Sequence, residues 1–477
     1  MIEVIKNILR IIKIFTIFAK FDSLIIFKNN FLLRFLSKII LITSGQKKKI
    51  ANKRPGERLA QALISMGPSF IKLGQALSTR PDIIGNNISN DLIKLQDKLP
   101  PFQFKEAERI LEEDLEGGIK LNFKEINPKP IAAASIAQVH FAITTENTPV
   151  AVKILRPGIR DDFKKDIELF YWLARIIERN YPDLRRLKPI KVIESFEKTS
   201  LLEMDLSLEA AAADELKDNH YDQKKFKIPK VDWQRTSSRI LTLEKVGGFN
   251  INDIESIKSN NLNPQDIVKN AAEVFFKMVF EYGFFHADMH PGNLFIDKKG
   301  TLIVVDFGIM GRLDKKTRRF LGEILLGFIS RNYRRVAEVH IEAGYVPNKE
   351  DVDSFAQACR SITEPILGKT LEKISIANLL EQLFRVSATF EMEMQPQLLL
   401  LQKSMLLVEG AGRMLAPNVN MWELARPLIE DWILNELRPD KRIQQKLIDM
   451  RKTMERLPRL MDNIEVLAKN IPKKDLK

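Results

Sequence analysis

The segment from His286 to Gly308 limits the fold of this chain more than any other, because it has the pattern of a short β-hairpin bounded by polar residues. Its two apolar runs, NLFID and TLIVVDFG, are separated by Lys-Lys-Gly, which is typical of strands joined by a turn. Asp288 and Asn293 flank the start of the first run, and Asp306 ends the second. Carboxylate and amide oxygens are hard ligands that suit Mg²⁺ bound to phosphates. The hairpin therefore predicts a site for a magnesium ion and a polyphosphate.

A zinc site is the competing interpretation of the same segment. His286 and His290 are four residues apart, as in the H-E-x-x-H helix of metalloproteases. However, Ala287 stands where that motif has glutamate, and Pro291 disfavours the continued helix that the spacing needs. The segment is therefore predicted to be a loop and not a zinc-binding helix.

The loop and hairpin resemble two motifs of protein kinases. HADMHPGN resembles the catalytic loop H-R-D-x-x-x-x-N, and VVDFG resembles the metal-binding D-F-G. This resemblance implies that Asp288 is the catalytic-loop acid, Asn293 a metal ligand and Asp306 the main Mg²⁺ ligand. The alternative is a buried hairpin with incidental carboxylates, but both motifs occur in the expected order and spacing.

The strand VAVK adds a candidate phosphate-binding residue. It ends in Lys153, which resembles the kinase lysine that contacts the α- and β-phosphates. Such a lysine needs an acidic partner, and LLEMDLSLEAAAADEL offers Glu203, Asp205 and Glu209 on one expected helix. Glu209 is the predicted partner, although acids of this kind often belong to a solvated helix face.

The segment before VAVK departs from the protein-kinase pattern. Protein kinases cover the phosphates with G-x-G-x-x-G, because glycine lets backbone amides approach the anion. This chain has IAAASIAQVH instead, and the Cβ atoms of Ala132, Ala133 and Ala134 narrow the allowed backbone angles. These alanines, Ser135 and Lys153 are the predicted nucleotide-binding residues, and nucleotide handling should differ from that of a protein kinase.

These features, together with FIKLGQALSTRPD, closely resemble the UbiB family of atypical kinases over about residues 55 to 434. The resemblance implies a protein-kinase-like fold with a helical N-terminal extension. Its K-x-G-Q motif corresponds to Lys72, Gly74 and Gln75, of which Lys72 and Gln75 would reach the active site and occupy room that a protein substrate needs. The E-x-D pair, here Glu203 and Asp205, would lie beside them. Lys72 in a site rich in carboxylates would be electrostatically matched, whereas the alternative is an exposed lysine beside a glycine.

The family resemblance also implies a function. Members support ubiquinone biosynthesis, show ATPase activity, associate with membranes and interact with lipids or quinone intermediates. The leading expectation is an ATP- and Mg²⁺-dependent kinase or ATPase in which Lys72, Lys153, Glu209 and Asp288 are catalytic and which does not phosphorylate proteins in trans. The alternative is a scaffold without catalysis, in which ATP switches a lipid-binding shape that gathers other ubiquinone-biosynthesis proteins.

Charge and cysteine content narrow the choice of partners. The formal net charge of +13 favours acidic partners such as anionic lipid, nucleotide or nucleic acid. The cations are dispersed and no nucleic-acid recognition motif is present, so nucleic-acid binding is not expected. The only cysteine, Cys359, rules out an internal disulfide and fits a reducing compartment.

The N-terminal segment from Ile2 to Phe27 has the pattern of an amphipathic helix. Its cations Lys6, Arg10, Lys13 and Lys20 fall on one face at about 100° per residue. Such a helix can lie in a membrane interface, whereas a helix in the core or in a homodimer contact is the alternative. The chain contains no run of about 18 uncharged apolar residues, so a membrane-spanning helix is not predicted. A cleaved signal is disfavoured because the cations are spread through the apolar stretch.

The expected fold class is α+β, a bilobal protein-kinase-like fold with a largely helical C-lobe. The expected regions are a membrane-associating N-terminal region (1–50), a helical extension with K-x-G-Q (51–126), an N-lobe (127–247), a C-lobe (248–437) and a basic amphipathic tail (438–477). Many bacterial relatives end in hydrophobic membrane helices, whereas this chain ends in IPKKDLK. Peripheral attachment to the cytoplasmic face of the bacterial inner membrane is therefore expected, through the N-terminal helix, the tail or partner proteins.

Overall fold

The structure is a computed structural model in two compact units. One unit is Met1–Ala271 with Phe284–Arg312 and Met394–Val419, and the other is Ala272–Gly283 with Leu313–Glu393 and Asn420–Lys477. The described residues are 2–23, 38, 40–43, 45, 52–78, 84–93, 95, 99–180, 185, 188–220, 222–347, 351–365, 382, 386, 389–392, 396–419 and 427–432. The predicted basic tail (438–477) and residues 24–27 of the predicted N-terminal helix lie outside them.

An antiparallel sheet of five strands forms the centre of the first unit. Its strands are β1 (Phe123–Ile126), β2 (Ala132–Ala133), β3 (Ala137–Thr144), β4 (Pro149–Leu155) and β6 (Ile240–Glu244). They lie in the order β1-β3-β4-β6, and β2 pairs with β3. The pairing register aligns Ala132 with Val139 and Val139 with Lys153. Ala132 is thus two strands away from Lys153, at the same position along the strand direction.

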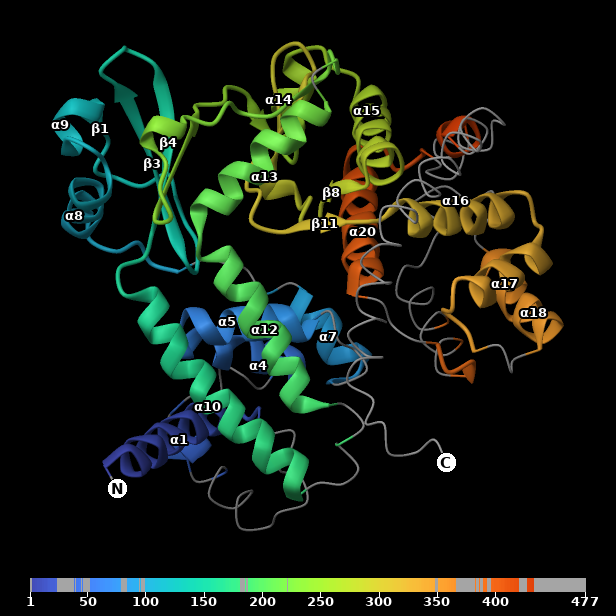
Figure 1. The fold of residues 1–477 in the computed structure, drawn as a ribbon, viewed down its shortest axis with the longest axis horizontal. Coiled ribbons are helices and arrows are strands. Elements are labelled where there is room, and N and C mark those ends of the chain that lie inside the picture. Colours follow the sequence, from blue (N-terminus) through green and yellow to red (C-terminus); the bar gives the residue numbers. More distant parts are fainter. Residues whose placement is uncertain are drawn as a thin grey trace, which may run out of the picture. The chain divides into compact units, whose positions relative to one another are not determined.

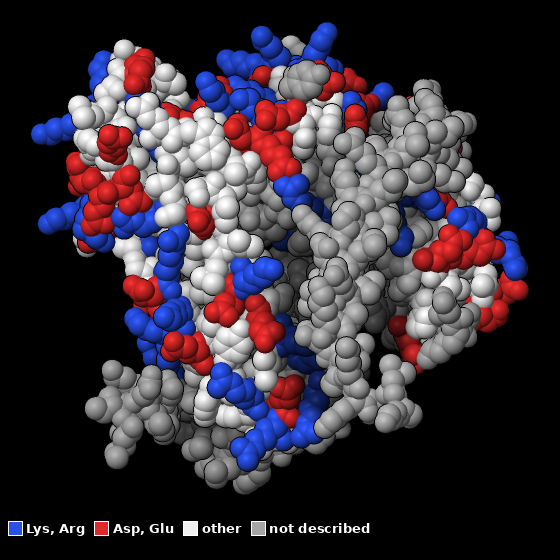
Figure 2. Space-filling model, in the orientation of Figure 1, with Lys and Arg blue, Asp and Glu red and all other residues white. Residues whose placement is uncertain are grey.

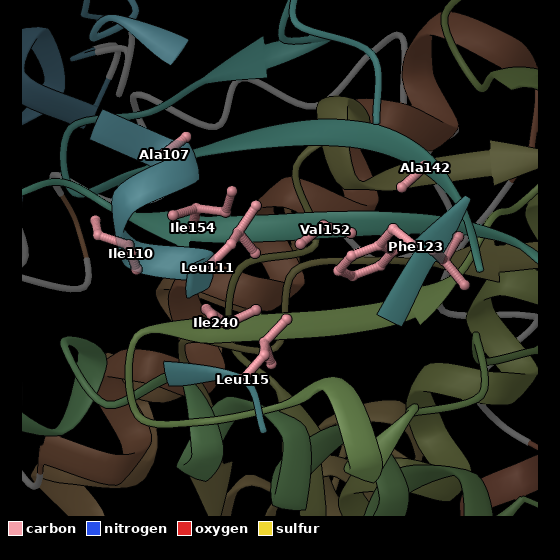
Figure 3. Close-up of a cluster of buried hydrophobic side chains, with 10 residues drawn as sticks. Ala107, Ile110, Leu111, Leu115, Phe123, Ala142, Val152, Ile154 and Ile240 are labelled. Carbon is pink, nitrogen blue, oxygen red and sulfur yellow. The ribbon is translucent and has the colours of Figure 1, made fainter. Parts of the chain in front are cut away.

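A hydrophobic core fixes this sheet against helix α8 (Phe104–Asp114), as Figure 3 shows. The strands alternate buried and more exposed side chains, as expected when one face packs on a helix. The buried cluster consists of Ala107, Ile110, Leu111, Leu115, Phe123, Ala142, Val150, Val152, Ile154 and Ile240. Because Val152 and Ile154 are in this core, the residue between them, Lys153, points to the opposite face of the sheet.

Helices that precede the sheet in the chain, or lie between its strands β4 and β6, form a second layer of the same unit (Figure 1). They are α1 (Ile2–Lys20), α4 (Pro55–Met66), α5 (Pro68–Ser78), α7 (Asn86–Ile93), α10 (Ile159–Asn180) and α12 (Pro189–Glu203). Helix α5 contacts α4, α7, α10 and α12, so it lies within the layer. A Cβ atom at Gly74 would lie only 2.6 Å from the Leu63 Cδ1 atom, so glycine allows α4 and α5 to approach closely.

The prediction of one helix carrying Glu203, Asp205 and Glu209 is wrong. Helix α12 ends at Glu203, and α13 (Leu206–Asn219) begins after Asp205. The Asp205 carboxylate accepts a hydrogen bond from the Ser207 backbone amide at 3.1 Å, so Asp205 is the N-cap of the new helix. Asp205 is not in a helical conformation, so the helix is interrupted between Glu203 and Glu209.

Two small sheets hold the predicted hairpin. The first has the order β5-β10-β9-β7, with strands β5 (Phe226–Lys227), β7 (Phe249–Asn250), β9 (Leu294–Ile296) and β10 (Leu302–Val304). The second pairs β8 (Phe284–His286) with β11 (Met310–Arg312). Strands β9 and β10 are antiparallel, so the predicted hairpin is confirmed.

The remaining elements are mainly helices. They are α9 (Gly118–Asn122), η2 (Trp233–Arg235), α14 (Ile254–Ser259), α15 (Pro264–Phe276), the π-helical turn η3 (Lys277–Tyr282), η4 (Pro291–Asn293), α16 (Lys315–Ile329), α17 (Tyr333–Glu342), α18 (Val352–Thr363) and α20 (Pro396–Leu415). In the second unit, α17 packs against α16 and α18. Helices with sheets that are antiparallel except for the parallel pair β5 and β10 confirm the predicted α+β class.

The surface carries charges of both signs. Figure 2 shows basic and acidic side chains interspersed over the face that it displays. Within the described part of the chain, none of the helices combines the length and apolar character needed to span a bilayer. In α1, Arg10 pairs with Asp166 of α10, whereas Lys13 and Lys20 are exposed.

His340 of α17 should make stability depend on pH. It is partly buried, with ring contacts to Tyr345 and Phe355, and its Nδ1 atom donates to the Val336 carbonyl at 2.7 Å. Burial lowers the pKa of His340 below the ordinary 6.5, as burial also does for His140 and His286. Below that pH the unfolded chain binds a proton that the folded chain excludes, so the free energy of unfolding falls as pH falls.

We therefore expect His340→Phe to weaken this pH dependence by up to about 1.4 kcal/mol per pH unit. Denaturant unfolding of the wild type and the variant between about pH 7.5 and 5.5 measures it. Equal slopes for the two proteins would contradict the assignment of a neutral, partly buried His340.

Candidate phosphate and magnesium site

The hairpin brings Asn293 and Asp306 to the same end. Leu294 pairs with Val304, and the Val305 amide donates to the Asn293 carbonyl at 3.0 Å. Asn293 is the last residue of η4, and Asp306 follows β10 by two residues. Asp306 has a φ of 66°, a left-handed conformation that costs a non-glycine residue of the order of 1–3 kcal/mol. The surrounding contacts must therefore hold this aspartate in place.

His286 ties the two loops together. Its Nε2 atom lies 2.7 Å from the Asp306 carbonyl, and its Nδ1 atom accepts from the Asp288 amide at 3.1 Å. The Asn293 side-chain amide donates to the Asp288 carbonyl at 3.1 Å. Burial lowers the pKa of His286, although Asp288 and Asp306 oppose the shift. The ring is thus neutral, with its proton on Nε2, and it fixes the backbone at both aspartates.

Lys153 joins the sheet to two acidic positions far along the chain. Its Nζ atom lies 2.8 and 2.9 Å from the two carboxylate oxygens of Glu209 and 2.9 Å from Asp306 Oδ1. Glu209 is buried on the first turn of α13, and its Oε1 atom also accepts from the Phe307 amide at 3.3 Å. The ion pair predicted between Lys153 and Glu209 is therefore present.

The protonation states of this trio follow from burial and from the shared ammonium. Burial would lower the pKa of Lys153, but Asp306 and Glu209 raise it above its ordinary value. Burial would raise the pKa of Asp306, but Lys153 holds it below its ordinary value. Burial raises the pKa of Glu209 to about 7, against the opposing effect of Lys153. Glu209 is therefore partly protonated near neutral pH, and an added cation would favour its ionised form.

Lys72 pairs with Glu203. Its Nζ atom lies 2.5 Å from Glu203 Oε2, and both side chains are about one-tenth exposed. The prediction that Lys72 is buried beside an acid is confirmed. The charge of Lys72 also contributes, after burial, Lys153 and His286, to the shifted pKa of Asp306, so these side chains are electrostatic neighbours. Gln75 lies one turn further along α5 and is half-buried.

The predicted nucleotide-binding segment has other structural partners. Ala132 and Ala133 form β2, and the Ala134 amide donates to the Ala137 carbonyl at 2.8 Å. That amide is therefore engaged inside the turn. Ser135 is fully buried, so its side chain does not face solvent. The segment is placed near Lys153 by strand pairing, and its nucleotide-binding role stays a prediction.

Lys403 is a residue of the site that the sequence analysis missed. It lies on α20, and its Nζ atom is 2.9 Å from Asp288 Oδ1. The signal in the sequence was a lone cation in the strongly apolar stretch LLLLQKSMLL. Such a lysine needs an acidic partner or a route to solvent, but nothing in the sequence identified Asp288 as the partner.

The donor set fits a magnesium ion. Among the described residues, no three side chains of His, Cys, Asp or Glu are grouped to hold a metal by themselves. Magnesium at nucleotide sites is usually bound by one or two protein oxygens, with phosphates and water completing the shell. The Asp306 carboxylate and the Asn293 amide oxygen, which belong to the same end of the hairpin, would supply such a pair.

Comparison with known proteins identifies the class. Residues 94–340 match the ABC1 atypical kinase-like domain, and residues 359–420 match the UbiB helical domain. The first match includes Lys153, Glu209, Asp288 and Asp306, and the second includes Lys403. The protein thus has an atypical kinase-like fold.

Curated relatives narrow the class to a family. The chain is 38% identical over 413 residues to the "Probable protein kinase UbiB" of Marinobacter nauticus, covering 85% of this chain and 76% of that protein. It is 40% identical over 394 residues to the protein of the same name in Vibrio cholerae, covering 82% and 72%. The chain belongs to the UbiB family, which confirms the family resemblance.

A solved structure supports the fold. The Mycobacterium tuberculosis protein Rv3197, solved in complex with erythromycin, superposes with a TM-score of 0.55 at 23% identity. The alignment covers 82% of this chain and 98% of that chain. At this identity the likeness concerns the fold alone.

Replacing Lys153 should destabilise the protein, because Glu209 and Asp306 then lack the ammonium that pairs with them. Lys153→Met leaves Glu209 and Asp306 without their shared ammonium, so we expect the free energy of unfolding to fall by about 3 kcal/mol. Adding Glu209→Gln removes one buried charge and should restore part of the loss. Denaturant unfolding measures both variants, with Lys258→Met at an exposed position of α14 as the control. A double variant less stable than Lys153→Met would contradict this account.

Proposed function

We propose that this protein is an Mg²⁺-dependent ATPase, or a kinase acting on a small molecule, that supports ubiquinone biosynthesis at a membrane. The ion-pair cluster of Lys153, Glu209 and Asp306 is the observation that carries the proposal, because it combines an oriented ammonium with a carboxylate next to Asn293. The bacterial relatives named as probable UbiB protein kinases support the pathway and the phosphotransfer chemistry.

Each of these residues would have a separate role in phosphoryl transfer. Lys153, oriented by Glu209, would bind the α- and β-phosphates of ATP. Asp306 and Asn293 would hold magnesium, which supplies positive charge to the phosphate oxygens when it is bound. Asp288 would orient a water or hydroxyl group and accept its proton as the bond to the γ-phosphorus forms and ADP leaves. Positioning and electrostatics would account for most of the rate.

The acceptor is proposed to be water or a small quinone-like or lipid molecule. Lys72 and Glu203 form their ion pair beside the cluster, which supports the expectation that this room is not available to a protein substrate in trans. The Ala132–Ala134 segment, with Ser135, would meet the nucleotide in a manner different from a glycine-rich loop. Gly74 and Gln75 of K-x-G-Q, and Asp205 as a helix cap, would support this arrangement.

A scaffold switched by ATP is the second candidate. Lys153 already contacts Asp306, so nucleotide and metal would have to replace that contact and could thereby shift the bound segments. In this case ATP binding changes shape and hydrolysis is dispensable, while a lipid-like precursor or other biosynthetic proteins are gathered.

Two aspartate variants test the enzyme proposal. Asp306→Asn should reduce Mg²⁺-dependent ATP turnover at least about 100-fold, because the metal ligand and its charge are weakened. Asp288→Asn should reduce turnover while ATP still binds. Asp297→Asn, in the turn at the opposite end of the same hairpin, is the matched control with normal turnover. Turnover is measured as released phosphate, with and without anionic liposomes and a quinone-like phenol.

The outcomes separate the candidates. No turnover by the wild type in any condition would exclude the ATPase. Loss of turnover in Asp288→Asn, with ubiquinone synthesis in cells still supported, would favour the scaffold.

Membrane attachment through α1 is a further part of the proposal. Lys13 and Lys20 are exposed, whereas Arg10 is engaged by Asp166 inside the protein. We expect Lys13→Glu/Lys20→Glu to reduce binding to vesicles with anionic lipid, because each cation near such a surface contributes about 1 kcal/mol. Co-sedimentation measures binding, and Lys105→Glu/Lys258→Glu, which changes the net charge equally at exposed positions elsewhere, is the control. Equal losses for both variants would refute a specific role of α1.

A further inference from the structure

The Asp288 carboxylate has a different basic neighbour at each oxygen. Lys403 Nζ lies 2.9 Å from Oδ1, and His290 Nε2 lies 3.8 Å from Oδ2. The Asp288 and Lys403 side chains are both about one-quarter exposed, so the pair is open to solvent and to small molecules. Lys153 and Lys72 pair with other acids of the site. Lys403 is thus the lysine that contacts the catalytic-loop carboxylate directly.

Helix α20 is packed so that Lys403 is held at this position. On either side of Lys403, Leu401 and Ser404 are buried, and the Ser404 hydroxyl donates to the Leu400 carbonyl at 2.8 Å. The helix contacts β11, which pairs with β8 so that Met310 is opposite His286. A chain of regular elements therefore connects Lys403 to the start of the catalytic loop, and the distance between Lys403 and Asp288 is set by packed structure.

A carboxylate that must accept a proton in one direction benefits from a contact that stops its rotation. Asp288 Oδ1 is taken by the ammonium, so Oδ2 remains for the attacking group. His290 flanks that oxygen, and its own ring is oriented because Nδ1 accepts from the Gly292 amide at 2.9 Å. Misplacing a reacting group by about 1 Å can cost about 100-fold in rate, so an orienting contact has a large effect.

We infer that Lys403 is a positioning residue for phosphoryl transfer, by which the UbiB helical domain completes the kinase-like site. This inference rests on the proposed function. Lys403 holds Oδ1 of Asp288, and Oδ2 takes the proton of the attacking water or hydroxyl group as its oxygen bonds to the γ-phosphorus. The bond between the γ-phosphorus and the bridging oxygen breaks, and its electron pair leaves with ADP. Lys403 changes neither charge nor bonding in this step.

The test is a double-variant cycle on ATP turnover by the full chain. Lys403→Met removes the ammonium and keeps the length of the side chain, and we expect it to lower kcat about 10- to 100-fold. The KM for ATP and the affinity for a non-hydrolysed ATP analogue should change less than about twofold, because the nucleotide contacts lie elsewhere. Lys403→Arg, which can still bind Oδ1, should recover most of the rate.

Coupling to Asp288 is the decisive part of the cycle. In an Asp288→Asn background, Lys403→Met should cause little further loss of kcat, because Lys403 acts through that carboxylate. A full additional loss, or a loss mainly in KM for ATP, would show that Lys403 acts on the nucleotide and would overturn the inference. Unchanged kcat in Lys403→Met would also overturn it.

Two controls separate this inference from misfolding and from the proposed function. Lys258→Met should leave kcat and KM unchanged, and thermal unfolding together with analogue binding shows whether Lys403→Met is folded. If Lys403→Met does not fold, Lys403→Arg decides, and a kcat as low as that of Asp288→Asn would count against the inference. If the wild type turns over ATP and Lys403→Met does so equally, only this inference fails. If the wild type shows no turnover, the proposed function fails and the inference falls with it.

Discussion

The ion pair of Lys153 with Glu209 and Asp306 is the contact on which the site depends. Its three residues lie on β4, on α13 and after β10. Glu209 is 56 positions and Asp306 is 153 positions from Lys153 in the sequence. The shared ammonium holds these three segments together, although the Asp306 side chain is 46% exposed. A cation beside the cluster would favour the ionised form of Glu209, whose pKa burial raises to about 7. This is the property of the cluster that supports the proposed binding of a nucleotide with a metal.

The features that distinguish this site from a protein kinase surround that cluster. Lys72 of the helical extension pairs with Glu203, and Lys403 of the UbiB helical domain pairs with Asp288. The helical extension and the UbiB helical domain thus each supply one lysine, and each lysine forms an ion pair with one acid. His286 connects the backbones of the two aspartate loops through a neutral ring. In this arrangement one added helix contacts the acid of the kinase-like catalytic loop and the other contacts an acid of the family's own E-x-D pair, while Ala132 and Ala133 are engaged in strand pairing.

Local sequence patterns predicted most of the structural features that depend on residues close together in the sequence. The hairpin and the α+β class could be predicted from turn residues and apolar patterns, and Glu209 could be predicted as a partner of Lys153 from the kinase motif. An acid beside Lys72 was implied by the family resemblance, which did not single out Glu203. The break between α12 and α13 was missed because Asp205 sits in a helical pattern, and only its hydrogen bond to Ser207 reveals a cap. Lys403 was missed for another reason. It is 115 residues from Asp288, and no periodicity links a lysine on an apolar helix to a distant loop.

The central claim is that this cluster binds a nucleotide with magnesium, and a structure of the protein with a non-hydrolysed ATP analogue and Mg²⁺ tests it most directly. The account predicts that Lys153 Nζ contacts a phosphate oxygen, that Asp306 and Asn293 ligate the ion, and that Glu209 keeps its ion pair with Lys153. A nucleotide bound elsewhere, with Lys153 still holding both carboxylates, would contradict it.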